Sequence, residues 1–345
     1  MNRTLLRSAV KSIAATLLLA MQASTQAQTI QGAGATFPYP IYKQWFAKFQ
    51  TATNVSVNYQ SVGSGAGIKA LQTKTVDFGA SDAPLSAEEE KAMPAPVVHI
   101  PTVGGAVALC YNLPSTGSGI RLTSDIVASI FMGKIKKWND PAIAAVNPKR
   151  VLPDLDIAPV HRTDGSGTTY IFTHYLKKVS PDWATSVGAG KSVNWPAGIG
   201  GKGNAGVAGV IQRTPGSIGY LELEYAVTNN ISYASIKNKA GNFVAPSVAS
   251  TTSAISQSAN ELKADIKAPI VNAGGKNSYP IAGLTYILIY KTGGANVANT
   301  TKLWGWALEK DQQEEAKALY YAPLPGNLLG VNKATLKSIT GSSIR

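Results

Sequence analysis

The sequence is poor in the residues that form covalent cross-links or bind transition metals. Its 345 residues include one cysteine and three histidines. Cys110 has no partner within the chain for a disulfide, so the hydrophobic core alone has to stabilise the fold. We expect this thiol to be buried and inert. His99, His161 and His174 are expected to be structural, because none has the spacing of a metal site, and no metal is predicted.

Acidic residues are also scarce. The formal net charge is +13, from 32 lysines and arginines against 19 aspartates and glutamates. Basic proteins often bind nucleic acids, but here the basic residues are scattered, and the densest cluster is only 134–137. Aromatic and basic residues do not alternate as they do on a nucleic-acid platform. Nucleic-acid binding is therefore disfavoured, whereas a positive surface would help to capture small anions.

Long apolar runs are missing except near the N-terminus. Three basic residues precede the apolar segment 13–20, and small residues follow it, which is the pattern of a secretory signal peptide. We predict that residues 1–27 are removed, which lowers the net charge to +10. The apolar segment is too short to span a bilayer. The mature protein is therefore expected to be exported and soluble, and its length suffices for two lobes.

Glycines and hydroxyl residues are plentiful, and they gather where strand patterns give way to helix patterns. Residues 161–169 read His-Arg-Thr-Asp-Gly-Ser-Gly-Thr-Thr and lie between a short strand pattern and a helical one. The unpaired N–H groups and the dipole at a helix N-terminus suit a small oxyanion. Arg162 can add a bidentate contact to it, and Asp164 can hold that guanidinium in place. Capping of the helix by Ser166 or Thr168 is the simpler alternative.

Two further junctions have the same character. The glycine-rich turn 32–38 contributes Thr36, and the turn 61–67 contributes Ser64, while a short strand pattern at 76–80 leads to Asp82. The turn 32–38 is not a dinucleotide fingerprint, because its third glycine position is occupied by Phe37 and no strand of useful length is expected before it. Residues 195–204 resemble a nucleotide-binding loop only superficially.

Alternation of strand and helix patterns indicates α/β lobes with helices on both faces of each sheet. Ligands of such folds collect where strand ends meet helix N-termini, so the three junctions are expected to share one site. The extended residues 97–111 are interpreted as a first crossing between lobes, and the strand pattern at 279–290 as the return. Residues 237–277 are polar, and surface excursions are expected there.

Five sequence blocks together resemble the periplasmic phosphate-binding proteins of bacterial ABC importers. The blocks are Gly-Ala-Gly-Ala-Thr-Phe-Pro (32–38), Val-Asp-Phe-Gly-Ala-Ser-Asp-Ala-Pro-Leu (76–85), Gly-Lys-Ile-Lys-Lys-Trp-Asn-Asp (133–140), Arg-Thr-Asp-Gly-Ser-Gly-Thr (162–168) and Gly-Gly-Lys-Gly-Asn (200–204). The resemblance extends from about residue 30 to residue 325, and it is weakest over 237–277 and at the C-terminal end.

The resemblance implies an α/β, two-lobed periplasmic binding protein fold of the type II kind. Each lobe would be a mixed sheet flanked by helices, joined through a hinge of two crossing segments. Lobe 1 would comprise residues 28–103 and 279–345, and lobe 2 residues 104–278. The implied function is the binding of inorganic phosphate in the periplasm and its delivery to an inner-membrane ABC permease. A monomer without cofactor, metal or catalytic residues is expected.

The family's phosphate ligands carry over residue by residue. Asp164 would orient the arginine among them, and His161, where relatives often have a second arginine, would at most tune the local charge. The implied phosphate ligands are Thr36, the Phe37 N–H, Ser64, Asp82, Arg162, Ser166, the Gly167 N–H and Thr168.

Asp82 is the unusual member of this set, because a carboxylate repels an anion. Phosphate still carries a proton at neutral pH and can donate it to Asp82, whereas sulfate carries none. We therefore predict that Asp82 penalises sulfate; a helix-capping role for this residue is the alternative. Other readings of the chain are a secreted phosphatase on the same scaffold, a receptor for sulfate, molybdate or arsenate, and an adhesin that uses residues 237–277. A phosphatase would need an activated nucleophile or a metal, and neither is visible in the sequence.

Overall fold

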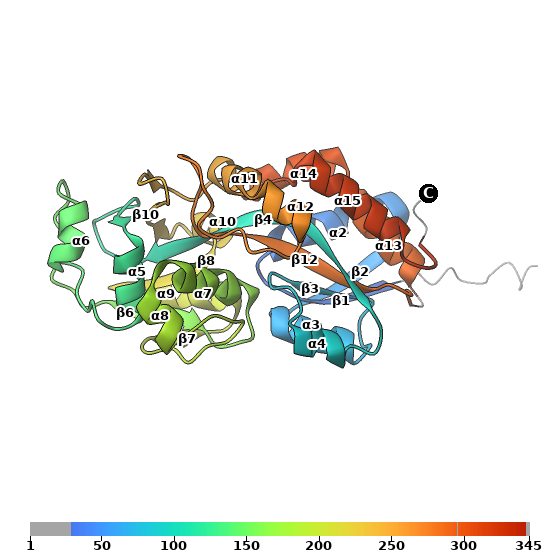
Figure 1. Ribbon diagram of the computed structural model, residues 1–345, viewed down its shortest axis with the longest axis horizontal. Helices are drawn as coiled ribbons and strands as arrows, with labels where there is room; N and C mark the ends of the chain where they lie inside the picture. The colour runs from blue at the N-terminus through green and yellow to red at the C-terminus, as the bar shows by residue number, and fades with distance from the viewer. Residues whose placement is uncertain (1–28, 295, 343–345) are drawn as a thin grey trace, which may run out of the picture.

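The protein is described by a computed structural model that covers residues 29–294 and 296–342. The predicted signal peptide and its cleavage site after Ala27 lie outside these residues. The described chain forms two α/β halves side by side, linked by the long strand β4 (Val97–Tyr111) (Figure 1). We name them lobe 1 and lobe 2. No helix of the described part is long and apolar enough to cross a membrane.

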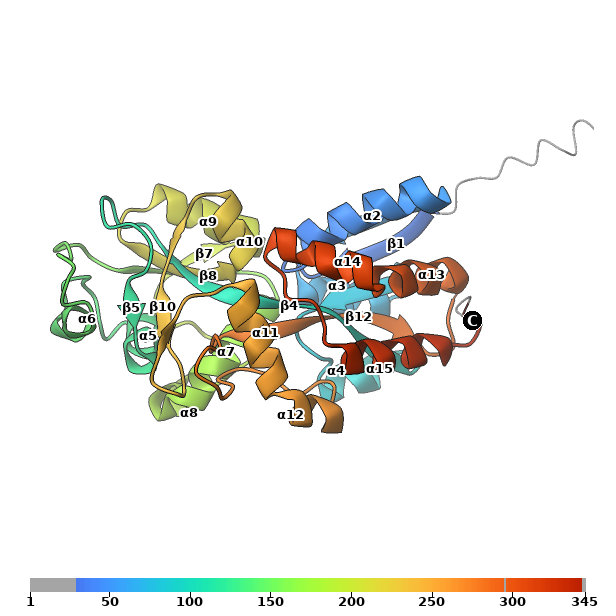
Figure 2. The ribbon, with the colours of Figure 1, turned by 90° about the horizontal axis from the view of Figure 1, so that it is seen from above.

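Lobe 1 contains both ends of the described chain and has helices on both faces of its sheet (Figures 1 and 2). Its strands are β1 (Thr29–Gly34), β2 (Ser56–Ser61), β3 (Phe78–Ser81), β12 (Ala282–Tyr290) and the first part of β4. Its helices are α2 (Tyr39–Thr53), α3 (Ser64–Gln72), α4 (Ala87–Ala92), α13 (Val297–Ala307), α14 (Lys310–Glu315), the 3-10 helix η1 (Ala316–Leu319) and α15 (Gly326–Lys337).

Lobe 2 is formed by the middle of the chain. Its strands are the rest of β4, β5 (Arg121–Leu122), β6 (Ala158–Arg162), β7 (Ile199–Gly201), β8 (Ser217–Glu222), β9 (Ser232–Tyr233), β10 (Ser235–Lys237) and β11 (Phe243–Val244). Its helices are α5 (Ser124–Phe131), α6 (Pro141–Val146), α7 (Gly167–Val179), α8 (Pro181–Ser186), α9 (Gly203–Arg213), α10 (Leu223–Thr228), α11 (Val248–Gln257) and α12 (Ala259–Ala264).

Both lobes contribute to one mixed sheet in the order β2-β1-β3-β12-β4-β8-β6-β7. The strands of the outer parts are parallel, while β12 and β4 run antiparallel to their neighbours. Along β4 the partner changes: Val97 to Ala106 pair with β12, and Val107 to Tyr111 pair with β8. The chain entering β12 crosses at the same place, since the Val107 N–H donates to the Ile281 carbonyl. Two crossing segments therefore join the lobes.

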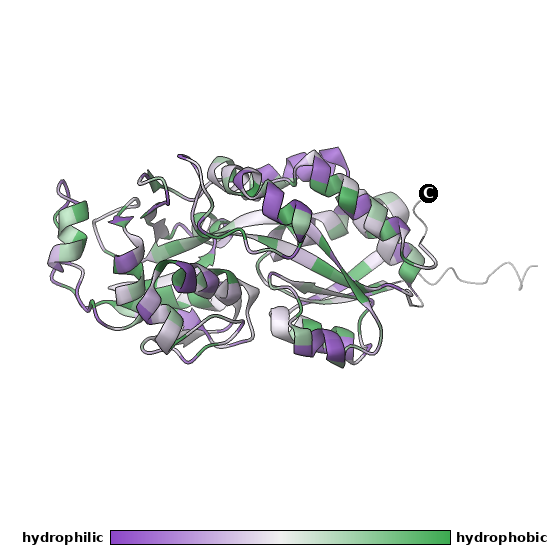
Figure 3. Cartoon of the chain, viewed as in Figure 1, coloured by the Kyte–Doolittle hydropathy of each residue, from purple (hydrophilic) through white to green (hydrophobic). Residues whose placement is uncertain are grey.

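The hydrophobic periodicity of the sequence finds its counterpart in the core. Helix α2 buries its apolar face, which includes Tyr42, Trp45 and Phe46. The ring of Trp304 from α13 packs edge-on against the ring of Tyr42, with the ring centroids 4.9 Å apart. Hydrophobic residues are concentrated along the central strands and the inner faces of helices, whereas α4 is largely hydrophilic (Figure 3). Cys110 is buried in β4, as expected.

Two expectations are wrong. A six-residue strand, β1, does precede the turn at 34–38; its glycines masked the pattern, and it is stabilised by parallel pairing with β2 on one side and β3 on the other. Residues 237–277 are not merely surface excursions. They include helices α11 and α12, and the side chain of Ile255 packs against Gly104 of β4, so this polar segment covers the hinge strand.

Candidate anion-binding site

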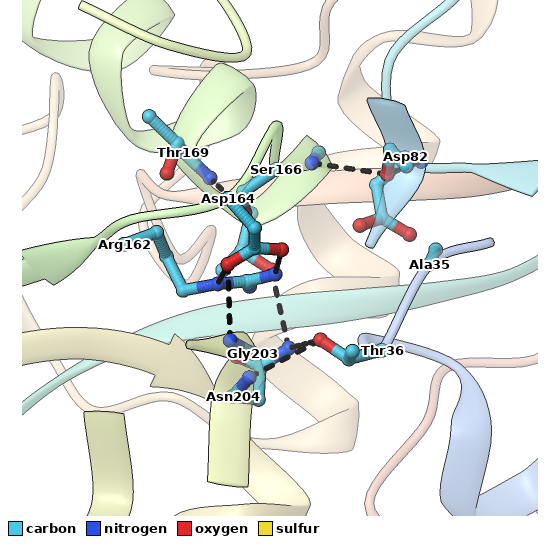
Figure 4. Close-up of polar contacts among 12 residues, drawn as sticks. Ala35, Thr36, Asp82, Arg162, Asp164, Ser166, Thr169, Gly203 and Asn204 are labelled. Atoms are coloured by element: carbon cyan, nitrogen blue, oxygen red, sulfur yellow. Dashed lines mark hydrogen bonds and ion pairs between the residues drawn. The ribbon is translucent and has the colours of Figure 1, made fainter. Parts of the chain in front are cut away.

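The predicted ligand residues meet where the two lobes face each other, and the structure buries all eight of them. Figure 4 shows Thr36 and Asp82 of lobe 1 opposite Arg162 and Ser166 of lobe 2. Each residue follows the carboxyl end of a strand or opens a helix, as the sequence predicts. The elements concerned are β1, α3 and β3 in lobe 1, and β6 and α7 in lobe 2.

The wall from lobe 2 is built around a buried arginine. Arg162 ends β6 and is held by two hydrogen bonds to Asp164, from Nε to Oδ1 at 2.8 Å and from Nη2 to Oδ2 at 2.5 Å. Its Nη1 donates to the Thr168 hydroxyl at 3.3 Å. This bidentate pair fixes the plane of the guanidinium group and so directs its remaining donors. The predicted orienting role of Asp164 therefore has a geometric basis.

The first turn of α7 completes this wall. Ser166 is the N-cap residue, and its hydroxyl accepts a hydrogen bond from the Thr169 N–H at 3.0 Å. Gly167 and Thr168 follow, at the positive dipole end of a thirteen-residue helix whose first N–H groups have no partner within the helix. Ser166 therefore caps the helix, as the simpler interpretation of this loop expected, and the same turn faces the space between the lobes.

The lobes touch across this space. The Gly167 N–H donates to the Ser64 hydroxyl at 3.0 Å, and the Gly65 N–H donates to the Gly165 carbonyl at 2.8 Å. At the edge of the interface, Lys191 and Glu89 form an ion pair at 2.7 Å. The structure is therefore that of a closed form, in which residues of one lobe complete the surroundings of residues of the other.

Asp82 is the only carboxylate among the eight predicted ligands. Its Oδ1 has no hydrogen-bond partner among the described residues, although the side chain is almost fully buried. Burial raises the pKa of this carboxyl to about 7, while the nearby Thr285 hydroxyl and the positive charge of Arg162 lower it. For Asp164, partial burial raises the pKa, but hydrogen bonds and charge from Arg162 outweigh it and hold that pKa below its usual range.

Two residues that the sequence argument did not assign also belong to the site. Asn204, at the start of α9, donates its side-chain amide to the hydroxyls of Thr36 and Thr168 at 2.8 and 3.3 Å. The Tyr225 hydroxyl donates to the Thr36 carbonyl at 2.6 Å. Asn204 ends the block Gly-Gly-Lys-Gly-Asn, so that block was the available signal. Nothing in the local pattern pointed to Tyr225.

The donor set suits an anion and not a metal. Within the described residues, no three His, Cys, Asp or Glu side chains gather as a metal site. His161 stacks on Trp195 with ring centroids 5.1 Å apart, which fits the structural role expected for it. A pocket of about 390 Å³ lies beside Thr36 and is lined by Tyr39, Lys202 and Tyr225, among others. The positively charged Lys202 side chain therefore lies at the edge of the site.

Comparison with known proteins identifies the family. A family model described as a PBP superfamily domain matches residues 20–307. The phosphate-binding protein PstS of Pasteurella multocida is 44% identical over 93% of this chain and 93% of its own length, and PstS of Xylella fastidiosa strain Temecula1 is 44% identical over 88% and 84%.

A solved structure shows the same architecture. The phosphate-binding protein from Stenotrophomonas maltophilia is 21% identical and superposes with a TM-score of 0.70, covering 92% of this chain and 96% of that one. The expected two-lobed periplasmic binding protein fold is confirmed by this similarity and by the family model. The chain therefore belongs to the PBP superfamily and, within it, to the family of the phosphate-binding proteins PstS.

Proposed function

We propose that this protein binds inorganic phosphate between its lobes and delivers it, in the periplasm, to an inner-membrane ABC permease for import. Phosphate is the cargo and not a cofactor. The observation that carries the proposal is the buried convergence of one arginine, a helix N-terminus and neutral hydroxyls from both lobes around a single carboxyl group. A buried anion requires this many donors, because an unsatisfied buried charge is costly.

The ligand residues carried over from the family are proposed to act as they do there. Arg162 supplies charge-assisted donors, α7 supplies N–H groups from Gly167 and Thr168, and hydroxyls from both lobes complete the set. Asp82 accepts a hydrogen bond from the proton that phosphate retains. This assignment is supported by the burial of the eight residues and by the contacts that link them.

Delivery to a permease is proposed to depend on lobe closure. We assign residues 28–103 and 279–345 to lobe 1 and residues 104–278 to lobe 2. The change of partner along β4, between Ala106 and Val107, supports a division close to the first of these boundaries. Closure around phosphate creates a shape that the permease can distinguish from the open form. The protein acts in this scheme as a monomer. Periplasmic location is supported by the signal-peptide pattern of residues 1–27.

A phosphatase on the same scaffold is the competing function. The serine hydroxyls of the site do not fit a nucleophile with a general base: Ser64 accepts from the Asp82 and Gly167 N–H groups, and Ser166 accepts from Thr169. Non-enzymatic binding is therefore the function proposed. Incubation with 4-nitrophenyl phosphate tests it, and release of nitrophenol that disappears with Arg162→Gln would favour the enzyme.

The first experiment is calorimetric titration of the mature protein, unfolded and refolded beforehand to remove carried-over anion. Tight one-to-one binding of phosphate and no heat with sulfate are expected. Arg162→Gln should weaken phosphate binding by about a hundredfold or more, because it removes a buried charged donor. Arg150→Gln is the matched control, since among residues 29–294 and 296–342 Arg150 donates only to the carbonyls of Thr116 and Ser118.

Absence of phosphate binding by the refolded wild type would overturn the proposal. Equal loss of affinity in Arg162→Gln and Arg150→Gln would reject the assignment of the site. Delivery is tested by phosphate uptake into spheroplasts that contain the importer but lack its own binding protein. Phosphate uptake that does not depend on the added protein would overturn the proposed delivery to the permease while leaving phosphate binding in place.

A further inference from the structure

Asn204 has its orientation fixed by the backbone of the neighbouring strand. The side chain is fully buried at the second residue of α9. Its Oδ1 accepts a hydrogen bond from the Glu222 N–H at 3.0 Å, and that N–H can only donate. The oxygen of the amide must therefore face β8. Consequently its Nδ2 group, with two protons to donate, faces the space between the lobes.

The Nδ2 group meets one threonine from each lobe. It donates to the Thr36 hydroxyl at 2.8 Å and to the Thr168 hydroxyl at 3.3 Å. Thr36 also accepts from the Asn204 backbone N–H at 3.2 Å, and Thr168 also accepts from Arg162 Nη1 at 3.3 Å. Each of the two hydroxyl oxygens therefore accepts two hydrogen bonds.

A threonine hydroxyl has two lone pairs and one proton. With both lone pairs occupied, the hydroxyls of Thr36 and Thr168 can take part in a further hydrogen bond only as donors. Neither of them donates to any group within residues 29–294 and 296–342. Their protons are thus available for an acceptor in the space that they border with Arg162.

We propose that Asn204 is a positioning residue of the phosphate site, which commits the hydroxyl protons of Thr36 and Thr168 to the anion. Because Thr36 belongs to lobe 1 and Asn204 to lobe 2, the same amide also fastens the closed form. This inference rests on the proposed function. It adds a determinant of affinity that does not itself contact the ligand, and it explains why an uncharged amide is buried there.

The proposal predicts that Asn204 acts through the two hydroxyls. Asn204→Ala frees both hydroxyls to rotate and should weaken phosphate binding by about ten- to thirtyfold. Asn204→Asp keeps the shape and the contact to the Glu222 N–H, but its second oxygen accepts the hydroxyl protons and turns lone pairs toward the anion. Asn204→Asp should therefore weaken phosphate binding more than Asn204→Ala at about pH 8. Because aspartate has the size of asparagine, this variant also allows the test if Asn204→Ala does not fold.

A double-mutant cycle separates positioning from general loss of structure. Thr168→Val removes one of the hydroxyls that Asn204 orients, so Asn204→Ala should cost clearly less affinity in that background than in the wild type. The matched control is Asn112→Ala. Asn112 donates to the carbonyls of Ile211 and Gln212 at the other end of α9, so its loss destabilises the same helix without touching the site.

The outcomes distinguish this inference from the proposed function. Calorimetric titration that finds no phosphate binding by the wild type removes the basis of both. Tight binding by the wild type, with Asn204→Ala or Asn204→Asp within about twofold of it, overturns the positioning role alone. The same holds if the Asn204→Ala and Thr168→Val losses are additive, or if Asn112→Ala weakens binding as much.

Discussion

Asp82 brings a carboxyl group into a site otherwise made of hydrogen-bond donors. Its Oδ1 is unpartnered within the described residues, and burial raises its pKa to about 7. In the proposed site, the ionised carboxylate would accept a hydrogen bond from the proton that phosphate retains and would repel sulfate, which has no proton to donate. The protonated carboxyl would itself be a donor and would no longer distinguish the two anions in this way. Selectivity at this residue is therefore expected to depend on pH.

The first prediction follows from that pKa. At about pH 8.5 sulfate should not compete with phosphate, whereas at about pH 5, below the pKa of Asp82, sulfate should compete measurably. Asp82→Asn, a neutral isostere, should admit sulfate at both pH values. Competition calorimetry over this pH range measures the effect. Selectivity that does not change with pH in the wild type, or that survives in Asp82→Asn, would reject Asp82 as the discriminating group.

Residue patterns indicated which residues gather between the lobes better than they indicated the residues that support them. Thr36, Ser64, Asp82 and Arg162 each stand at a junction between a strand and a helix, where a sequence signal exists. Asn204 is an ordinary amide at a helix start, and its function depends on a neighbour 18 positions away, the Glu222 N–H. Such a contact is set by the packing of α9 on β8, so the block that ends in Asn204 can point to the residue but not to its partner.

At the scale of elements, the strand-to-helix junctions were predictable because they carry turn and capping residues. Ser166 caps α7, as the sequence suggested, and Thr123 caps α5 in the same way. Strand β1 was missed because glycines weaken a strand pattern, yet Gly32 is required there, since a side chain would collide with the Phe78 ring. Helix α11 was missed because its sequence is rich in serine and threonine, and only packing on β4 reveals its buried face.

Glu222, at the end of β8, places a second buried carboxyl beside the hinge. Its Oε1 is unpartnered among the described residues, and Oε2 accepts from the Glu224 N–H at 2.8 Å. Burial raises its pKa well above the usual 4.5, whereas the hydrogen bond from the Glu224 N–H lowers that pKa and the charge of the Glu224 carboxylate raises it further. The folded protein therefore binds this proton at pH values where the unfolded chain has released it.

The second prediction concerns stability at this element. The folded state binds more protons than the unfolded chain in this pH range. The contribution of Glu222 to the free energy of unfolding is therefore fully present below about pH 4.5 and is lost as the pH rises toward the raised pKa of Glu222. Glu222→Gln should thus raise the free energy of unfolding at about pH 8, because it removes the cost of holding this carboxyl group in the folded protein. It should also flatten the decline of stability with pH. Urea unfolding at several pH values measures both effects.

The control for this measurement is Glu309→Gln, which alters an exposed carboxylate paired with Lys333. An exposed pair of this kind contributes little, so its variant should follow the wild type at every pH. A Glu222→Gln protein that is less stable than the wild type at about pH 8 would show that the carboxyl is ionised and satisfied in the folded state. That result would contradict the raised pKa of Glu222.

At the scale of the whole molecule, closure depends on backbone approaching backbone. Gly65 of lobe 1 faces Gly165 of lobe 2 at close range: a Cβ added at Gly65 would lie 3.2 Å from the Gly165 Cα. At Gly167 an added Cβ would lie 2.5 Å from the Asp82 Cβ and 2.6 Å from the Ser64 hydroxyl. Sequence alone indicated glycine-rich turns in both lobes but could not pair them, because the pairing exists only between the assembled lobes.

The third prediction tests closure without altering a ligand. Gly65→Val adds a branched side chain at the point of contact while leaving its N–H free to bond the Gly165 carbonyl. The lobes should fold normally but close incompletely, so phosphate binding should weaken by about tenfold or more as the closed population falls. Small-angle scattering should show that phosphate no longer contracts the protein as it does the wild type.

Ala66→Val is the matched control, because Ala66 is exposed on the same turn of α3 and the substitution places the same β-branched side chain in that helix, at a cost in helix propensity that Gly65→Val does not have. If Ala66→Val loses as much affinity as Gly65→Val, the loss arises within α3 and not between the lobes. If Gly65→Val binds phosphate normally and still contracts, the contact between Gly65 and Gly165 is not part of closure. A selective loss in Gly65→Val ties affinity to the meeting of the lobes, which is what a receptor that signals its loaded state to a permease requires.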